Sequence, residues 1–305
     1  MSEVKEKTSP PGGLLRELPE VEASGNVREI YEEIKSLCGV PMVALIYRHL
    51  ATIPGALEWA WALLRPVMAA GLVQERAWEL ADRASIPPTP SVPRAALRVA
   101  GIMAADETTI AAVLDAYGRA NPINILAVRC LALHLHGLAA NATESPDMRH
   151  WYAPRVLAPL PAMINPQDMD PAVRELVLLL TDRSESKASR ILPSLYRHLA
   201  RWPNLLGFAV VIVTPEFPAI DAAAGRLREQ VVLAATELAS LMVSPPNIEP
   251  PIAVHRDQLL AAIDSFTLRI PEMVVIGSLL SRAMPDRAPG FPNTAPGCLA
   301  WDGDA

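Results

Sequence analysis

Apolar residues recur with a helical period along most of the chain. One face of the segment 27–37, at i, i+3, i+4 and i+7 spacing, carries Val27, Ile30, Tyr31, Ile34 and Leu37. This pattern predicts an amphipathic helix. Good helix formers dominate the chain, and a strand-like alternation of Val, Ile and Thr between hairpin turns is missing from the sequence. Segment 209–214 has a strand-like composition, but segment 60–65, which lies 149 residues earlier, has the composition of a helix. We therefore predict an all-α fold.

The chain contains an internal repeat. The sequence Tyr-Arg-His-Leu-Ala begins at Tyr47 and again at Tyr196, 149 residues later. Segment 109–117 has the same apolar pattern as segment 258–266, at the same offset. A period of this length exceeds that of stacked solenoid units. It predicts two homologous helical repeats arranged as a pseudo-twofold pair, with a ligand cleft between them.

Proline-rich and aperiodic segments divide the chain. They predict a flexible N-terminal arm at 1–24, helical repeat 1 at 25–140, a Pro-rich linker at 141–171, helical repeat 2 at 172–285 and an irregular C-terminal tail at 286–305. The linker has to cross from one half to the other, so we expect part of it to cover the cleft. Prolines inside the repeats predict about five helices in each.

Composition excludes several functional classes. The chain has 305 residues, 51% of them hydrophobic, and a net charge of −6. This balance predicts a globular protein and argues against nucleic-acid and anionic-membrane partners. No apolar run approaches the ~20 residues of a membrane span, and the N-terminus does not resemble a signal peptide, so we expect a cytoplasmic protein. Cys38, Cys130 and Cys298 are far apart, which predicts reduced thiols.

Few residues form a known catalytic motif. Metal-binding, nucleotide-binding and serine-hydrolase patterns do not occur in the sequence, so we expect no metal and no cofactor. His49 and His198 occupy equivalent places in the two repeats, which favours a structural role over acid–base catalysis. Arg48 and Arg197 are candidates for binding a substrate carboxylate, although their repetition also favours a structural role.

Asn121 precedes Pro122, and this pair is typical of a helix start with Asn as the N-cap. The equivalent pair in the second repeat is Ile270-Pro271, which keeps the proline and lacks the asparagine. A cap that one repeat lacks is dispensable in this fold. The Asn121 amide is therefore also a candidate for orienting a carboxylate, a leaving group or a water molecule.

Several short motifs, in order, resemble the group I D,L-2-haloacid dehalogenases. They are Asn-Val-Arg-Glu-Ile-Tyr-Glu-Glu-Ile at 26–34, Gly-Val-Pro-Met-Val-Ala at 39–44, Arg-x-Leu-Ala-Thr-x-Pro-Gly at 48–55, Asn-Pro at 121–122 and Leu-Ala-x-Trp-Pro at 199–203. The resemblance extends from residue 21 to about 284 and includes the duplication. It implies an all-α enzyme, without a cofactor, in which an Asp activates water to displace halide beside a carboxylate. It also implies a homodimer, or a heterodimer with a related protein.

The resemblance carries over to the site only in part. Asn121 matches the family's Asn, and Ser194 matches the Ser before its catalytic Asp. The Asp position itself is Leu195, and the nearest upstream acids, Glu185 and Asp182, lie ten and thirteen residues before it. Leucine cannot take the proton of an attacking water, and such general-base assistance is worth ~10²–10⁴ in rate. We therefore do not expect ordinary hydrolytic dehalogenation.

Two functions remain open. The first is an enzyme that catalyses nucleophilic substitution at an sp3 carbon of a small carboxylic acid, by an altered displacement such as an intramolecular closure of an aziridine ring. Asn121 would then orient the leaving group or carboxylate and Ser194 would donate a hydrogen bond. The expected pocket residues are Met42, Leu45, Leu195 and Ile263, the first two at positions that are aromatic in the family. The alternative is a non-catalytic binding or structural subunit of a heteromer.

Overall fold

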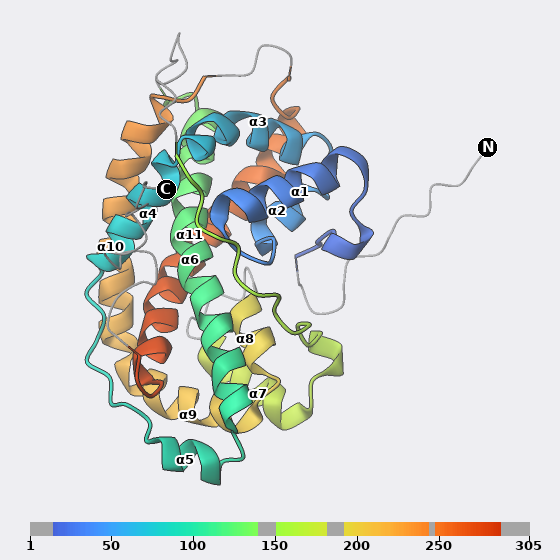
Figure 1. The fold of residues 1–305 in the computed structure, drawn as a ribbon. Helices are drawn as coiled ribbons and strands as arrows, with labels where there is room; N and C mark the ends of the chain where they lie inside the picture. Colours follow the sequence, from blue (N-terminus) through green and yellow to red (C-terminus); the bar gives the residue numbers. More distant parts are fainter. Residues whose placement is uncertain (1–14, 140–150, 182–191, 244–247, 288–305) are drawn as a thin grey trace, which may run out of the picture.

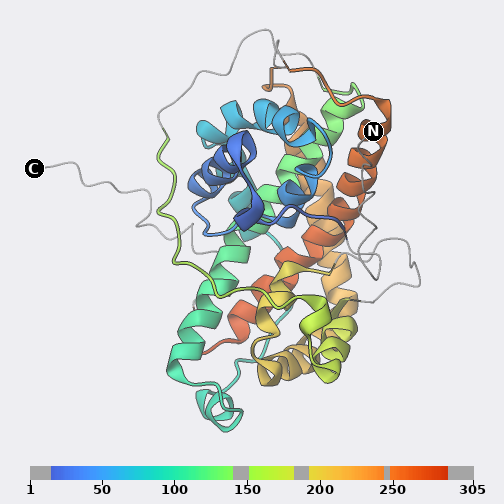
Figure 2. The same cartoon turned by 90° about the vertical axis from the view of Figure 1, so that its right-hand side faces the viewer.

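The computed structural model describes residues 15–139, 151–181, 192–243 and 248–287. Within these ranges the chain forms helices and no strand (Figures 1 and 2), so the predicted all-α fold is confirmed. The segment 209–214, whose composition is strand-like, forms the end of helix α9 (Pro203–Val213) and its C-cap Thr214, as predicted.

The two repeats supply corresponding helices. The first contributes α1 (Gly25–Cys38), α2 (Leu45–Leu50), α3 (Ala56–Ala69), α4 (Leu72–Asp82), α5 (Arg94–Val99) and α6 (Ala104–Leu135). The second contributes α7 (Pro171–Thr181), α8 (Ser194–Leu199), α9 (Pro203–Val213), α10 (Phe217–Ala239) and α11 (Ala253–Ala283). Helices α2 and α8 begin 149 residues apart, and so do α6 and α11. The pseudo-twofold arrangement of the repeats stays a prediction.

The repeats interlock rather than fold as separate lobes. Helices α6 and α11 pack along each other through the middle of the molecule (Figure 1). One hydrophobic cluster joins α1–α4 to the C-terminal half of α6 and the N-terminal half of α11; a second joins α7–α9 to the opposite halves. At ~1.5 Å per residue, the 32-residue α6 is too long for one lobe. Each core therefore contains residues of both repeats, so the repeats are not two separate bodies on either side of a cleft.

The Asn121-Pro122 pair does not begin a helix. Pro122 lies inside α6, as its equivalent Pro271 lies inside α11. A proline in a helix interior removes one backbone hydrogen bond and bends the helix without necessarily ending it. The indole of Trp78 donates a buried hydrogen bond of 3.1 Å to the carbonyl of Arg119, three residues before Pro122. The predicted N-cap role of Asn121 is therefore wrong.

Residues 15–24, which we predicted as part of a flexible arm, pack against the helical body. The backbone N–H of Leu18 donates to the carbonyl of Arg48 at 2.9 Å, and the hydroxyl of Tyr31 donates to the carbonyl of Leu18 at 3.1 Å. Leu15 and Leu18 contact the first cluster. We call residues 15–24 the N-terminal strap; the rest of the predicted arm lies outside the described residues.

The described part of the linker runs over the outside of the helices from one end of the molecule toward the other (Figure 2). The amide of Leu157 donates to Gly39 beyond α1, and that of Ile164 donates to Arg197 in α8. Trp151 lies against Gly71, where any added Cβ would be 2.3 Å from the indole. Residues 141–150 and most of the predicted tail are outside the described ranges.

By length and composition, the helical stretch 203–239 could cross a membrane, and 28% of its most apolar window is buried. One stretch of this kind is weak support for a membrane span, because core helices of globular proteins have the same length and composition.

Candidate functional site

A cavity of about 60 Å³ lies where the two hydrophobic clusters meet, between the loop before α2, the start of α8 and the middle of α6 and α11. One water needs roughly 10–15 Å³ of such space, so the cavity has room for a small organic acid. Its wall is mainly apolar, with a few polar side chains. Pro122 and Pro271 each directly follow a residue of the wall, Asn121 and Ile270.

Six of the eight side chains predicted for the site line this cavity. They are Met42, Leu45, Arg48, Asn121, Ser194 and Leu195. Ile263 and Arg197 do not line it: Ile263 is fully buried in the first cluster, and Arg197 lies in α8 and points to the strap. The described linker residues do not line the cavity either, in contrast to our expectation that they cover the cleft. The arrangement brings together segments about 150 residues apart in the sequence.

Equivalent positions of the two repeats line the cavity together. The pairs, each 149 residues apart, are Ala44 and Pro193, Leu45 and Ser194, Ile46 and Leu195, Tyr117 and Phe266, Ala120 and Arg269, Asn121 and Ile270, and Asn124 and Met273. In five of these pairs one residue is polar and its partner is apolar. Equivalent positions of the two repeats therefore line the same cavity, but their side chains differ in polarity.

Three polar groups of the wall lack ordinary partners among the described residues. The amides of Asn121 and Asn124 make no hydrogen bond there, and Asn124 is only 4% exposed. The buried Ser194 hydroxyl makes no hydrogen bond of good geometry, although it lies close enough to Tyr117 to lower that phenol's pKa slightly against the larger effect of burial. The two asparagine amides are available to a ligand.

The sequence analysis missed Asn124, Tyr117 and Arg269. The sequence did contain a signal for Asn124. Its equivalent in the second repeat, Met273, is apolar, and the same difference between repeats had singled out Asn121, three residues earlier. Residues three apart share one face of a helix. No comparable pattern separated Tyr117 from a core aromatic residue.

The described wall of the cavity contains no aspartate or glutamate. Leu195, which we expected at the position of the catalytic Asp from the resemblance, is 1% exposed, and a Cβ added at Gly277 of α11 would lie 4.0 Å from its side chain. Asp182 and Glu185 lie outside the described residues. Among the residues that can be placed, water in the cavity has no carboxylate to take its proton.

The Tyr117 hydroxyl and Nδ1 of His198 lie 2.9 Å apart, between α6 and α8. Their rings meet edge to face with centroids 5.6 Å apart. Burial, with smaller contributions from Arg197 and Arg48, lowers the pKa of His198 to about 4, although hydrogen bonds to the Pro161 and Ser194 backbones oppose the shift. Neither His198 nor His49 lines the cavity, so a structural role fits both better than catalysis.

We expect His198 to make folding stability depend on pH. Its pKa is 6.5 as a model histidine and about 4 when folded, so the unfolded chain binds the proton more readily between these values. Stability is therefore full above the unfolded pKa and falls as the pH drops toward the folded one, by about 2 kcal/mol between ~pH 7 and ~pH 5. Urea unfolding of the parent and of His198→Asn at several pH values measures this. Equal slopes in the two proteins would show that His198 does not contribute.

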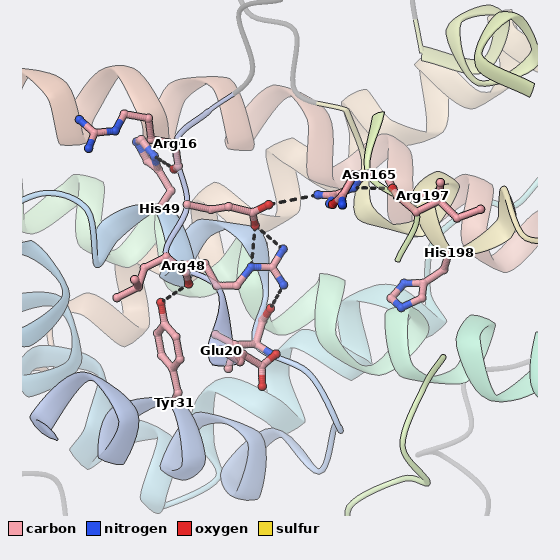
Figure 3. A network of polar contacts seen from close by, with 12 residues as sticks. Arg16, Glu20, Tyr31, Arg48, His49, Asn165, Arg197 and His198 are labelled. Atoms are coloured by element: carbon pink, nitrogen blue, oxygen red, sulfur yellow. Dashed lines mark hydrogen bonds and ion pairs between the residues drawn. The ribbon is translucent and has the colours of Figure 1, made fainter. Parts of the chain in front are cut away.

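Arg48 and Arg197, the equivalent arginines of the two repeats, bind the same carboxylate of the N-terminal strap. Nε and Nη2 of Arg48 lie 2.8 and 2.7 Å from Oε2 of Glu17, and Nη1 of Arg197 lies 3.2 Å from its Oε1. Figure 3 shows both guanidinium groups in this network. The two arginines therefore hold a protein carboxylate, not a substrate carboxylate as we considered.

The strap also fixes the cavity wall at Val43. Oε1 of Glu20 accepts the N–H of Val43 at 2.8 Å, and Nη1 of Arg48 donates to its carbonyl at 3.0 Å. Both backbone groups of this fully buried wall residue are thus satisfied. The carboxylates of Glu17 and Glu20 together balance the charges of Arg48 and Arg197 on this side of the cavity.

Metal binding has no support in the described residues, where no group of three or more His, Cys, Asp or Glu comes together. The two cysteines that the structure places, Cys38 and Cys130, are buried and unpaired. Burial raises the pKa of each thiol to about 12, so both stay protonated and unreactive near neutral pH.

No family model matches the chain. It is 28% identical over 209 residues, 62% of its length, to a "2-haloacid dehalogenase, configuration-inverting" from Alcaligenes xylosoxydans xylosoxydans, and it spans 65% of that relative. It is 26% identical over 220 residues to a protein of the same description from Pseudomonas sp. (strain 113), covering 67% of this chain and 71% of the relative.

Solved structures agree with these relatives. A D-2-haloacid dehalogenase mutant in complex with D-2-CPA has a TM-score of 0.67 to this chain and the enzyme with L-LA has 0.68, each at 20% identity and covering 89% of this chain and 97% of the other. The order of the helices, the cavity and these comparisons lead to one conclusion. The chain is a divergent relative of the configuration-inverting 2-haloacid dehalogenases and has the D-2-haloacid dehalogenase fold.

Proposed function

We propose that this protein catalyses nucleophilic substitution at an sp3 carbon of a small carboxylic acid, with a nucleophile that the substrate itself carries. The composition of the cavity wall supports the proposal. Asn121, Ser194 and Leu195 all line the cavity, and the described residues of the wall include no carboxylate. A displacement pocket of this kind suits a substrate that does not depend on a protein base to activate water.

In the proposed step, an amine of the substrate attacks the carbon that carries the leaving group. The new C–N bond forms as the bond to the leaving group breaks, halide or sulfate departs with the electron pair, and the extra proton on nitrogen passes to solvent. The product is an aziridine ring. Asn121 and Ser194 hold the carboxylate and the leaving group by hydrogen bonds, while the apolar wall excludes competing water. Orientation alone can supply several kcal/mol in a reaction within one molecule.

Two positive side chains of the wall favour the reactive form of such an amine. Arg48 and Arg269 both line the cavity, although each also contacts a carboxylate, Glu17 and Glu272 respectively. A nearby positive charge disfavours protonation of an amine, and only the unprotonated amine has a lone pair to attack carbon.

Halide release from two substrates tests the proposal. We expect the protein to release chloride from 3-amino-2-chloropropionate and to form aziridine-2-carboxylate, identified by mass spectrometry. From 2-chloropropionate, which lacks the amine, we expect release to be slower by about 100-fold or more, because general-base assistance to water is worth ~10²–10⁴. Asn121→Ile, which copies the residue of the second repeat, is expected to lose most of the ring closure.

Rapid release from 2-chloropropionate with alcohol as the product would contradict the proposal and establish ordinary hydrolysis. Release from neither substrate, with a folded protein that still binds carboxylic acids, would favour the alternative of a non-catalytic subunit.

We further propose that the protein pairs as a homodimer or with a related chain. Its mass by light scattering, alone and after co-expression with such a chain, tests this.

A further inference from the structure

Asn124 is a buried polar side chain without a partner in the described part of the chain. It lies in the middle of α6, is 4% exposed, and lines the cavity beside Asn121. Its amide can donate two hydrogen bonds and accept others. The amide faces the cavity. Without a protein partner it is less favourable to folding than an apolar side chain of the same shape.

The fold itself does not require an amide at this position. The equivalent residue of the second repeat is Met273, which lines the same cavity. A buried amide with a structural role looks different in this protein. Nε2 of Gln74, fully buried, donates to the carbonyls of Leu37 and Met68 at 3.1 and 2.9 Å. Asn124 has no such contacts, which points to a ligand as its partner.

We infer that Asn124 binds a second hydrogen-bonding group of the substrate, so that the cavity selects carboxylic acids with a neutral polar substituent over simple ones. This inference rests on the proposed function, in which that substituent is the unprotonated amine. The amide oxygen of Asn124 accepts its N–H, and Asn121, one turn earlier, remains free for the carboxylate or leaving group. A site built to hydrogen-bond a substituent discriminates strongly against the analogue that lacks it.

Binding of two unreactive acids tests this without any catalysis. The probes are 3-hydroxypropionate and propionate, which differ by one hydroxyl; a hydroxyl is used because Arg48 and Arg269 disfavour an ammonium group. Dissociation constants from ligand-observed NMR are expected to favour 3-hydroxypropionate by about tenfold in the parent chain, a difference of ~1.4 kcal/mol. In Asn124→Leu, which has nearly the same shape, we expect the two probes to bind equally.

Thermal unfolding of the same variant separates a ligand-binding role from a structural one. Replacing an unsatisfied amide by an apolar side chain removes a buried polar group, so Asn124→Leu is expected to raise the melting temperature. Gln74→Leu, the matched control, removes two buried hydrogen bonds and is expected to lower it. A lower melting temperature for Asn124→Leu would overturn the inference.

Two further results would also overturn it: equal affinity of the parent chain for both probes, and an unchanged preference in Asn124→Leu. Failure of the proposed function gives a different pattern. In that case the parent chain prefers 3-hydroxypropionate and loses this preference in Asn124→Leu, but forms no aziridine from 3-amino-2-chloropropionate.

Discussion

Replacing Leu195 by aspartate is expected to give the protein a water-activating base, and with it hydrolytic release of chloride from 2-chloropropionate. Leu195 lines the cavity between Ser194 and the interior of α8, and Asn121 faces the same space. A carboxylate there would take the proton of an attacking water. We expect the rate to rise by ~10²–10⁴, the usual contribution of a positioned general base. Initial rates of chloride release with both enantiomers measure the gain.

Leu195→Asn is the matched control, because it has the shape and polarity of the aspartate but cannot act as a base. We expect it to fold and to show no increase in the rate of chloride release. This result would separate base catalysis from the effect of a more hydrated cavity. A folded Leu195→Asp protein with no more activity than Leu195→Asn would show that position 195 is not where the water is activated.

The parent chain supplies a second check on the same point. If it already hydrolyses 2-chloropropionate at a rate that Leu195→Asp does not improve, its base is another residue. Asp182→Asn and Glu185→Gln would then identify it, since these two acids precede α8 in the sequence and lie outside the described residues.

Glu17→Gln is expected to destabilise the protein by about 3 kcal/mol, since it leaves two buried arginines without their shared carboxylate. The side chains of Arg48 and Arg197 are 5% and 10% exposed and that of Glu17 is 24% exposed. The loss should therefore lie at the lower end of the range for buried ion pairs. Urea unfolding with a fixed m-value measures it.

The surface of α4 offers a matched control. There Glu79 also contacts two arginines, Arg76 at 2.8 Å and Arg83 at 2.6 Å, but Arg83 is 65% exposed. Because water screens exposed pairs, Glu79→Gln should cost less than about 1 kcal/mol. Equal effects of the two substitutions would contradict a special role of Glu17 in joining the repeats.

Glu17→Gln should also loosen the cavity wall. Arg48 donates a hydrogen bond to the carbonyl of Val43 in the cavity wall. Without Glu17 to position Arg48, we expect weaker binding of propionate as well as lower stability. If binding stays unchanged while stability falls, the network of Glu17 and the two arginines serves the fold alone.

The sequence by itself determined the helical character, the duplication and six of the cavity residues. Helical periodicity is local, because residues three and four apart share one face wherever the helix lies. The repeat then paired positions 149 residues apart, and six of the eight predicted site residues do line one cavity. Asymmetry within a pair, as between Asn121 and Ile270, was the informative signal.

Only the tertiary structure decided how the repeats interlock, that Pro122 and Pro271 lie inside long helices, and that Glu17 binds both arginines. Each depends on contacts between segments far apart in the sequence: Trp78 with Arg119, or the N-terminal strap with α2 and α8. Whether a buried polar group is satisfied depends on the same contacts. For this reason Gln74 and Asn124 look alike in the sequence, although one bonds to two carbonyls and the other faces an open cavity.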